Sequence, residues 1–254
     1  MPSPFLPAGA PAAPAADAAF DARRVRALTL DLDDTLWPIW PTIERAEKVL
    51  HGWLAREAPR TAELLLTPGV LREIRQAVDA AHPELGHDMS ALRRESIRVA
   101  LSRAGEDPQL AQPAFEAFFA ERQRVTLYED VLPSLQWLSD RFALVALSNG
   151  NADIHLAGVG SWFKGAISAR EFGQGKPHAP IFQAAADLLG LAPGDVLHVG
   201  DDAALDVVGA LDAGMQAAWL VRDGRPWEFA QRPHLIVHDL HALCVALGAN
   251  PAPG

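Results

Sequence analysis

The chain has 254 residues, of which 49% are hydrophobic and 21% charged, a balance typical of a globular protein with one large domain or a core carrying an insertion. Its formal net charge of −10 argues against nucleic acid or an anionic membrane as the main partner. A single cysteine, Cys244, excludes an internal disulfide and favours a reducing compartment, and we expect it to pack in the core.

The N-terminal residues 1–20 are rich in proline and alanine, which predicts a flexible tail. They lack the basic start and sustained apolar stretch of a secretory signal, and no apolar run reaches the length of a membrane span. We therefore expect a cytoplasmic protein. The β-leaning run Val25 to Leu30 predicts the first strand.

A helical block follows this strand. Apolar residues recur at helix spacing from Thr42 to Arg124 and predict four helices without a strand between them. Two prolines delay the expected helix start to Pro41. Trp37 and Trp40 are expected to pack at the hinge, with lining of a pocket mouth as the alternative. The predicted organisation is an α/β core of residues 21–40 and 125–250 with an inserted helical cap of residues 41–124.

Strand and helix patterns alternate after the cap. Strands are predicted at 142–147, 165–168, 196–199, 216–221 and 234–237, and helices at 131–140, 180–189, 203–213 and 240–247. This rhythm predicts a Rossmann-like parallel sheet covered by helices on both faces.

Polar side chains follow several of the predicted strands. Asp31 and Asp33 come directly after the first strand, Ser148 and Asp201 end two others, and Lys176 lies in a Gly/Pro-rich turn. Each alone has an ordinary alternative: an acidic turn, a helix cap or a solvated loop charge. Because parallel strands bring their carboxyl ends to one edge, we expect all of them to meet there. Such a set suits phosphoryl transfer with a magnesium ion.

In order along the chain, Asp31-Leu-Asp33-Asp-Thr-Leu, Ser148-Asn-Gly, Lys176-Pro and Gly200-Asp-Asp-Ala-Ala-Leu-Asp206 resemble the four motifs of the haloacid dehalogenase superfamily. The resemblance covers about Val25 to Leu247. It implies that the helical insertion is a cap of the first type, since the chain between Ser148 and Lys176 is too short for the second type.

The resemblance also implies a role for each motif residue. Asp31 would attack phosphorus, and Asp33 would act as the acid and base. Mg²⁺ would be held by Asp31, Asp201 and the backbone carbonyl of Asp33. Ser148 would bind a phosphoryl oxygen, and Lys176 would neutralise charge. Three further residues are expected to support this site. Asp206, together with Asp202, would orient Lys176 or metal-bound water, and Asn149 would contact the phosphate.

A closer resemblance is carried by the stretches His82 to Asp88, Ser148 to Ala152, Leu197 to Asp202 and Ala213 to Ala217. They are similar to bacterial phosphatases acting on 5-amino-6-(5-phospho-D-ribitylamino)uracil and flavin mononucleotide, which implies riboflavin biosynthesis or flavin turnover.

The cap offers candidates for substrate contact, each with a structural alternative. His87, Asp88 and Arg94 are the candidates. A local hydrogen bond at a helix start would equally explain the first two, and a solvated helix face would explain Arg94 with its neighbours Arg93 and Arg98. His198 lies within an apolar strand and is expected to be a hydrogen-bonded core residue.

Three function classes remain. The first is a magnesium-dependent phosphatase for a small metabolite: the two flavin-related substrates, or alternatively phosphoglycolate, a nucleotide or a sugar phosphate. The second is a dehalogenase, which would have no use for an acid at Asp33 or a metal ligand at Asp201. The third is a binding protein that kept the fold. We expect a monomer or homodimer without nucleic-acid or membrane partners.

Overall fold

The computed structural model describes residues 20–249, so most of the predicted N-terminal tail lies outside the described residues. Its centre is a parallel sheet with the strand order β3-β2-β1-β4-β5-β6. The strand bounds are β1 Ala27–Leu30, β2 Ala143–Ser148, β3 Gly165–Ser168, β4 Val196–Gly200, β5 Gln216–Leu220 and β6 Leu235–Val237. The predicted Rossmann-like sheet is therefore confirmed, with β1 in its interior.

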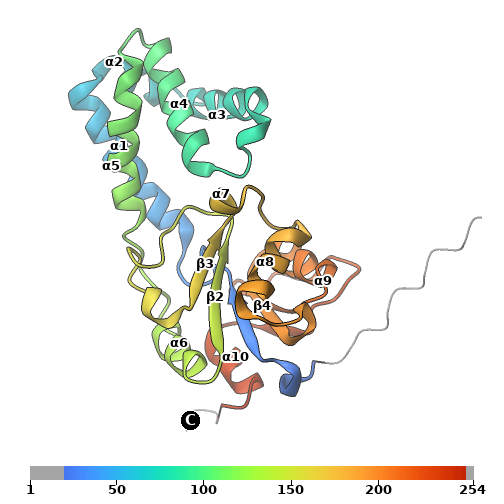
Figure 1. The fold of residues 1–254 in the computed structure, drawn as a ribbon. Helices are drawn as coiled ribbons and strands as arrows, with labels where there is room; N and C mark the ends of the chain where they lie inside the picture. The colour runs from blue at the N-terminus through green and yellow to red at the C-terminus, as the bar shows by residue number, and fades with distance from the viewer. Residues whose placement is uncertain (1–19, 250–254) are drawn as a thin grey trace, which may run out of the picture.

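Helices cover both faces of the sheet (Figure 1). Because side chains alternate along a strand, Leu28 and Leu30 of β1 face a core shared with α6 (Val131–Ser139) and α10 (Leu240–Ala246). Neighbouring strands send their alternate residues to the other face, where they pack on α8 (Ala179–Leu189) and α9 (Gly209–Asp212). Cys244 is buried in the first of these cores, as predicted.

The block inserted between the turn after β1 and helix α6 consists of helices joined by short turns. Its helices are α1 Ile39–Glu57, α2 Pro59–Leu66, α3 Val70–Ala81, α4 Met89–Arg103 and α5 Ala111–Arg122. They bury their own apolar clusters and stand beyond the carboxyl ends of β2 and β3 (Figure 1). We propose that these five helices act as the cap.

Several local predictions about the cap were wrong. The block contains five helices, because Pro59 at the first position of α2 starts a separate short helix. Helix α1 begins at Ile39 rather than Pro41, since a proline in the first turn lacks only an N–H that would have no helical partner. Trp40 is 72% exposed, whereas Trp37 is fully buried at the hinge.

The remaining ordered turns are short. They are the 3₁₀ turns Ala22–Arg24, Pro83–Leu85, Pro108–Leu110, Gly160–Trp162 and Pro193–Asp195, the helical turn α7 Ala169–Phe172, and a π-helical segment Ala203–Val208. Within residues 20–249, no helix combines the length and the apolar character that crossing a bilayer requires.

Candidate active site

The turn after β1 directs its carboxylates toward the edge of the sheet. Asp31 still continues the strand, donating its backbone N–H to Val199 at 2.9 Å. Asp34 has a left-handed backbone with φ of 57°, and its side chain accepts from the N–H of Ile39 at 2.9 Å. Aspartate tolerates this conformation better than most residues. Asp34 therefore closes the turn and joins it to α1, which leaves Asp31 and Asp33 to the site.

Lys176 is the centre of the site. Its side chain is 2% exposed, and its Nζ donates to Asp31 Oδ1 at 2.6 Å and to Asp206 Oδ1 at 2.5 Å. The lysine thus bridges the carboxylate that follows β1 and the carboxylate of the π-helical segment after β4. A buried ammonium between two carboxylates is held in position by charge-assisted hydrogen bonds.

Asn149 fixes the backbone of this lysine. Its Nδ2 donates to the Lys176 carbonyl at 2.8 Å, and its Oδ1 accepts from the Lys176 N–H at 2.7 Å. Both ends of the amide are therefore used, and a phosphate contact would require the side chain to release Lys176. Ser148 is buried at the end of β2, and its Oγ accepts from the N–H of Gly150 at 2.9 Å.

The carboxylates after β4 have different tasks. Asp202 caps the following segment, accepting from the N–H groups of Ala204 and Leu205 at 2.8 Å each. Asp206 Oδ2 accepts from the N–H of Asp202 at 2.9 Å. The nearest polar contacts of the Asp201 side chain are longer, with Thr35 Oγ1 at 3.4 Å and Arg225 at 3.8 Å.

The buried histidine His198 contacts Asp206. The Nε2 of His198 lies 3.2 Å from Asp206 Oδ1, and its Nδ1 lies 2.8 Å from Thr29 Oγ1. His198 was predicted as a hydrogen-bonded core histidine, and this geometry confirms the prediction. Burial lowers the pKa of His198, which favours the neutral ring.

The charges at the site do not balance among themselves. Burial raises the pKa of Asp31 well above its usual value, and the nearby Asp206 and Asp201 add to the rise. Burial, Asp206 and Asp34 raise the pKa of Asp201 to about 7. Lys176 and His198 instead hold the pKa of Asp206 low against the effect of burial. One ammonium, that of Lys176, thus serves a group of three carboxylates, so further positive charge is needed if all three are to remain ionised.

The donor set fits a hard divalent cation. Asp31, Asp201 and Asp206 each offer a carboxylate oxygen, and these oxygens lie within 4.8 Å of one another. The sequence instead predicted Asp31, Asp201 and the backbone carbonyl of Asp33. Asp206 is already bonded through both oxygens, so we assign it to Lys176 and retain Asp31 and Asp201 as the candidate ligands.

One site residue was not found from the sequence. Arg122, the last residue of α5, donates its Nη2 to both oxygens of Asp33 at 2.7 Å. The indole Nε1 of Trp37 donates to Asp33 Oδ1 at 2.8 Å. No local signal marks an arginine 89 residues away from its partner, so only the fold could reveal this contact.

Two of the three predicted substrate contacts of the cap, Asp88 and Arg94, have structural partners. His87 is half-buried before α4, and Asp88 caps α4 through the N–H of Ala91 at 2.9 Å. Asp88 also lies 3.7 Å from Arg170 of α7, so it links cap and core. Arg94 reaches Gln112 near the start of α5, at 3.5 Å.

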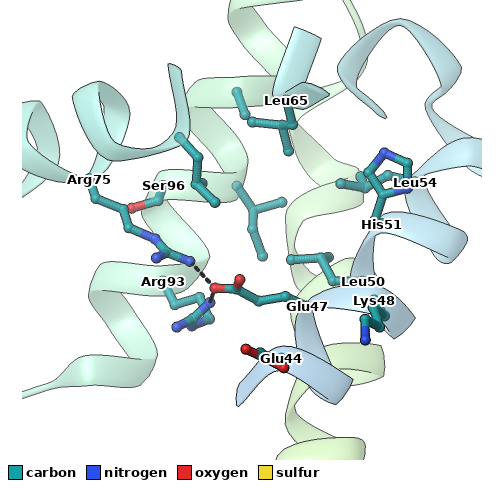
Figure 2. Close-up of a pocket in the computed structure, with 13 residues that line it drawn as sticks. Glu44, Glu47, Lys48, Leu50, His51, Leu54, Leu65, Arg75, Arg93 and Ser96 are labelled. Carbon is teal, nitrogen blue, oxygen red and sulfur yellow. Dashed lines mark hydrogen bonds and ion pairs between the residues drawn. The ribbon is translucent and has the colours of Figure 1, made fainter. Parts of the chain in front are cut away.

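The cap contains a cavity of about 320 Å³ between α1, α3 and α4 (Figure 2). Its wall is largely apolar, and Glu47 lies between Arg75 and Arg93 on one side, at 2.6 and 3.4 Å. Arg93 was predicted on a solvated face, but its side chain is only 18% exposed. Burial, helped by the charges of Arg75 and Arg122, lowers the pKa of Arg93 to about 10. His51 Nε2 is buried here without a hydrogen-bond partner among residues 20–249.

Comparisons with known proteins agree on the type of molecule. A family model described as haloacid dehalogenase-like hydrolase matches residues 25–214. The chain is 34% identical to the 5-amino-6-(5-phospho-D-ribitylamino)uracil phosphatase YigB of Escherichia coli (strain K12), over 87% of this chain and 95% of the relative. It is 32% identical to a phosphoserine phosphatase of Thermus thermophilus, over 87% and 99%. A crystal structure of a 2-haloacid dehalogenase from Pseudomonas syringae pv. Tomato DC3000 superposes with a TM-score of 0.83 at 36% identity, over 88% and 98%.

Proposed function

Since the chain belongs to the haloacid dehalogenase-like hydrolases and is a phosphatase of that family, we propose that it hydrolyses a small phosphorylated metabolite through an aspartyl-phosphate at Asp31 with Mg²⁺. The observation that carries the proposal is the position of Lys176. Its ammonium touches Asp31 and is fixed by Asp206, while Asp201 offers a further carboxylate nearby. This arrangement suits charge neutralisation around a phosphoryl group.

The reaction assigns one task to each side chain. A carboxylate oxygen of Asp31 attacks phosphorus, the ester P–O bond breaks, and Asp33 gives its proton to the departing oxygen. Asp33 then takes a proton from water, which attacks the aspartyl-phosphate and releases phosphate. Ser148 donates to a phosphoryl oxygen, and Lys176 balances charge between nucleophile and phosphoryl group.

The remaining site residues keep this machinery in place. Asn149 holds the Lys176 backbone, Asp206 holds its ammonium, and Asp202 caps the segment that carries Asp206. Asp31, Asp201 and the backbone carbonyl of Asp33 are the proposed magnesium ligands. The bound cation would supply the positive charge that the two carboxylates lack and would neutralise phosphoryl oxygens.

For the substrate, we propose 5-amino-6-(5-phospho-D-ribitylamino)uracil or flavin mononucleotide. The support is the resemblance to YigB over 87% of the chain. The cap cavity is our candidate for the ring end of these molecules, because its walls are apolar and its size lies at the lower end of ligand pockets, about 300–1,000 Å³. The chain is also similar to a phosphoserine phosphatase, so other small phosphate esters are retained as alternative substrates.

A haloacid dehalogenase is the second candidate, favoured by the name of the similar Pseudomonas syringae structure. Halide leaves without a proton, so this reaction would need neither an acid at Asp33 nor a cation beside Asp201. Here Arg122 and Trp37 hold the Asp33 carboxylate beside Gly150, and the carboxylate oxygens of Asp31, Asp201 and Asp206 lie within 4.8 Å of one another. Both features favour the phosphatase.

The test is a panel of phosphate esters and one 2-haloacid, each assayed with and without Mg²⁺. We expect phosphate release that depends on Mg²⁺ and no halide release. Preference for the two flavin-related esters over phosphoserine, phosphoglycolate, nucleotides and sugar phosphates would support the substrate. Metal-independent halide release would overturn the phosphatase.

The cap residues are tested by a substrate comparison. His87→Ala and Asp88→Ala should impair hydrolysis of flavin mononucleotide more than that of a small aryl phosphate, and Arg94→Ala tests the third candidate. Arg98→Ala is the matched control, since within residues 20–249 the Arg98 side chain pairs with its neighbour Glu95 alone, on the exposed face of α4. Equal losses on both substrates would mean that these residues are structural.

A further inference from the structure

Arg122 connects the last cap helix to the catalytic turn. Its side chain is 2% exposed and reaches Asp33 from the end of α5. The adjacent Gln123 is also buried, and its amide bonds the core loop after β2, at the carbonyl of Asn151 (3.3 Å) and the N–H of Asp153 (2.8 Å). The chain is therefore fixed to the core immediately beside Arg122, which defines where the guanidinium can reach.

The Asp33 carboxylate is held against the phosphate-binding turn. A Cβ added to Gly150 would lie 2.4 Å from Asp33 Oδ2 and 3.3 Å from Ser148 Oγ. The carboxylate therefore lies over the backbone of Gly150, on the side of the proposed phosphoryl contact Ser148. Arg122 and Trp37 donate to it from other directions, so the side chain is confined by three neighbours.

One terminal nitrogen of the Arg122 guanidinium has no hydrogen-bond partner among the described residues. Its Nη2 serves Asp33, whereas its Nη1 is buried without a hydrogen-bond partner within the described part of the chain. Burying a guanidinium with an unmet donor is costly, so a purely structural arginine would be expected to find acceptors for both nitrogens. The two short contacts to Asp33 are what hold Arg122 in this position.

We propose that Arg122 is a positioning residue for the acid and base Asp33, an inference that rests on the proposed phosphatase function. Arg122 pairs with the ionised carboxylate in the resting site. Once Asp33 has taken up a proton, Nη2 donates to its carbonyl oxygen and keeps the O–H directed at the departing ester oxygen. That oxygen receives the proton as the P–O bond breaks, which leaves Asp33 as the carboxylate paired with Arg122. Because Arg122 ends the cap, this alignment depends on how the cap is seated on the core.

The loss of rate on replacing Arg122 should depend on the leaving group of the substrate. A nitrophenolate leaves without help from an acid, whereas an alkoxide must be protonated as it departs. Displacing a catalytic group by about 1 Å costs on the order of 100-fold. Arg122→Lys keeps the charge but replaces the planar guanidinium, whose Nη2 lies 2.7 Å from both Asp33 oxygens, with an ammonium on a shorter side chain.

The experiment is a single-turnover measurement of leaving-group release from nitrophenyl phosphate and from an alkyl phosphate. We expect Arg122→Lys to slow release of the alcohol by roughly 10- to 100-fold and release of nitrophenolate by less than about 3-fold. In steady state, kcat on the alkyl ester should fall with little change in KM. Arg122→Gln should behave alike, and circular dichroism and thermal melting confirm that each variant is folded.

Two comparisons separate positioning from loss of structure. Arg222→Lys is the matched control, because Arg222 donates to both oxygens of Asp130 at 3.0 Å within the core. It should change melting temperature without changing the ratio of the two release rates. In an Asp33→Asn background, Arg122→Lys should have no further effect on release of the alcohol, since its partner is already lost.

The measurements distinguish a wrong role for Arg122 from a wrong role for Asp33. If Asp33→Asn slows the alkyl ester selectively but folded Arg122 variants slow both esters equally, the positioning role is overturned and the phosphatase mechanism stands. Additive losses in the double variant would overturn it as well. If Asp33→Asn itself shows no selectivity, the assignment of Asp33 as the acid fails, and the role of Arg122 falls with it.

Discussion

Asp201 provides a test of whether the site is built for a cation at the expense of stability. Its carboxyl is buried among other carboxylates, which raises its pKa to about 7. We predict that Asp201→Asn abolishes magnesium-dependent activity and, in a metal-free buffer at pH 8, makes the protein more stable. Asparagine retains the oxygen that Thr35 contacts at 3.4 Å but removes the buried charge.

The size of the effect follows from the change in proton affinity. A rise from 3.8 to about 7 spans about 3 pKa units, which corresponds to at most about 4 kcal/mol. The side chain is 17% exposed, so we expect about half of this amount. For a protein of this size, about 2 kcal/mol raises Tm by roughly 4–8 °C.

The raised pKa of Asp201 determines how the free energy of unfolding changes with pH. The folded state binds the Asp201 proton more tightly than the unfolded state does, so the contribution of Asp201 to wild-type stability falls as pH rises from about 4 to about 7. The stability gain of Asp201→Asn should therefore be largest above pH 7 and should vanish near pH 4.

Thermal unfolding with a chelator at pH 5 and pH 8 measures this difference. Asp187→Asn, an exposed carboxylate on α8, is the control and should change Tm little at either pH. Adding Mg²⁺ should stabilise the wild type by ligand binding and leave Asp201→Asn unchanged. An Asp201→Asn protein that is no more stable than wild type at pH 8 without metal would refute the reasoning.

Three further outcomes are expected. Asp31→Asn should fold normally, by circular dichroism, and lower kcat at least about 1,000-fold; near-normal turnover would remove the nucleophile assignment. Activity should disappear with a chelator, return with Mg²⁺ and return poorly with Ca²⁺, whose looser coordination misplaces the nucleophile; full activity after exhaustive chelation would exclude the metal. Gly150→Ala should reduce kcat strongly, because its Cβ would lie 2.4 Å from Asp33 Oδ2; unchanged kinetics would mean that this carboxylate is free to move.

The strand-end residues could be predicted because their environment is local in sequence. Asp31 and Ser148 directly follow apolar strands, and parallel pairing of those strands brings their ends together. Lys176 could be placed there from its turn after a predicted strand, and the motif resemblance implied that Asp206 orients it or a metal-bound water. The bonds of Lys176 to Asp31 and Asp206 required the three-dimensional structure.

Contacts between distant segments could not be predicted. Arg122 lies on a helix whose sequence resembles any helix with a basic end, and its meaning comes from Asp33, far away in the chain. Arg93 was expected to be solvated because charged residues usually are, but Phe118 and Glu47 from neighbouring helices enclose it. The division of the cap into five helices depended on Pro59, whose place at a first helical turn only the structure established.

The two chain crossings between cap and core lie side by side. The N–H of Tyr128 donates to the carbonyl of Leu36 at 3.1 Å, so the insertion leaves and re-enters the core at neighbouring points. Replacing everything between such points need not alter the register of β1 against β2, since the cost of closing a loop grows slowly with its length. The cap can therefore be replaced as a unit by the cap of a related protein. A chimera carrying the cap of another phosphatase should adopt the donor's leaving-group preference only if the graft boundary leaves Arg122 and Gln123 in the recipient.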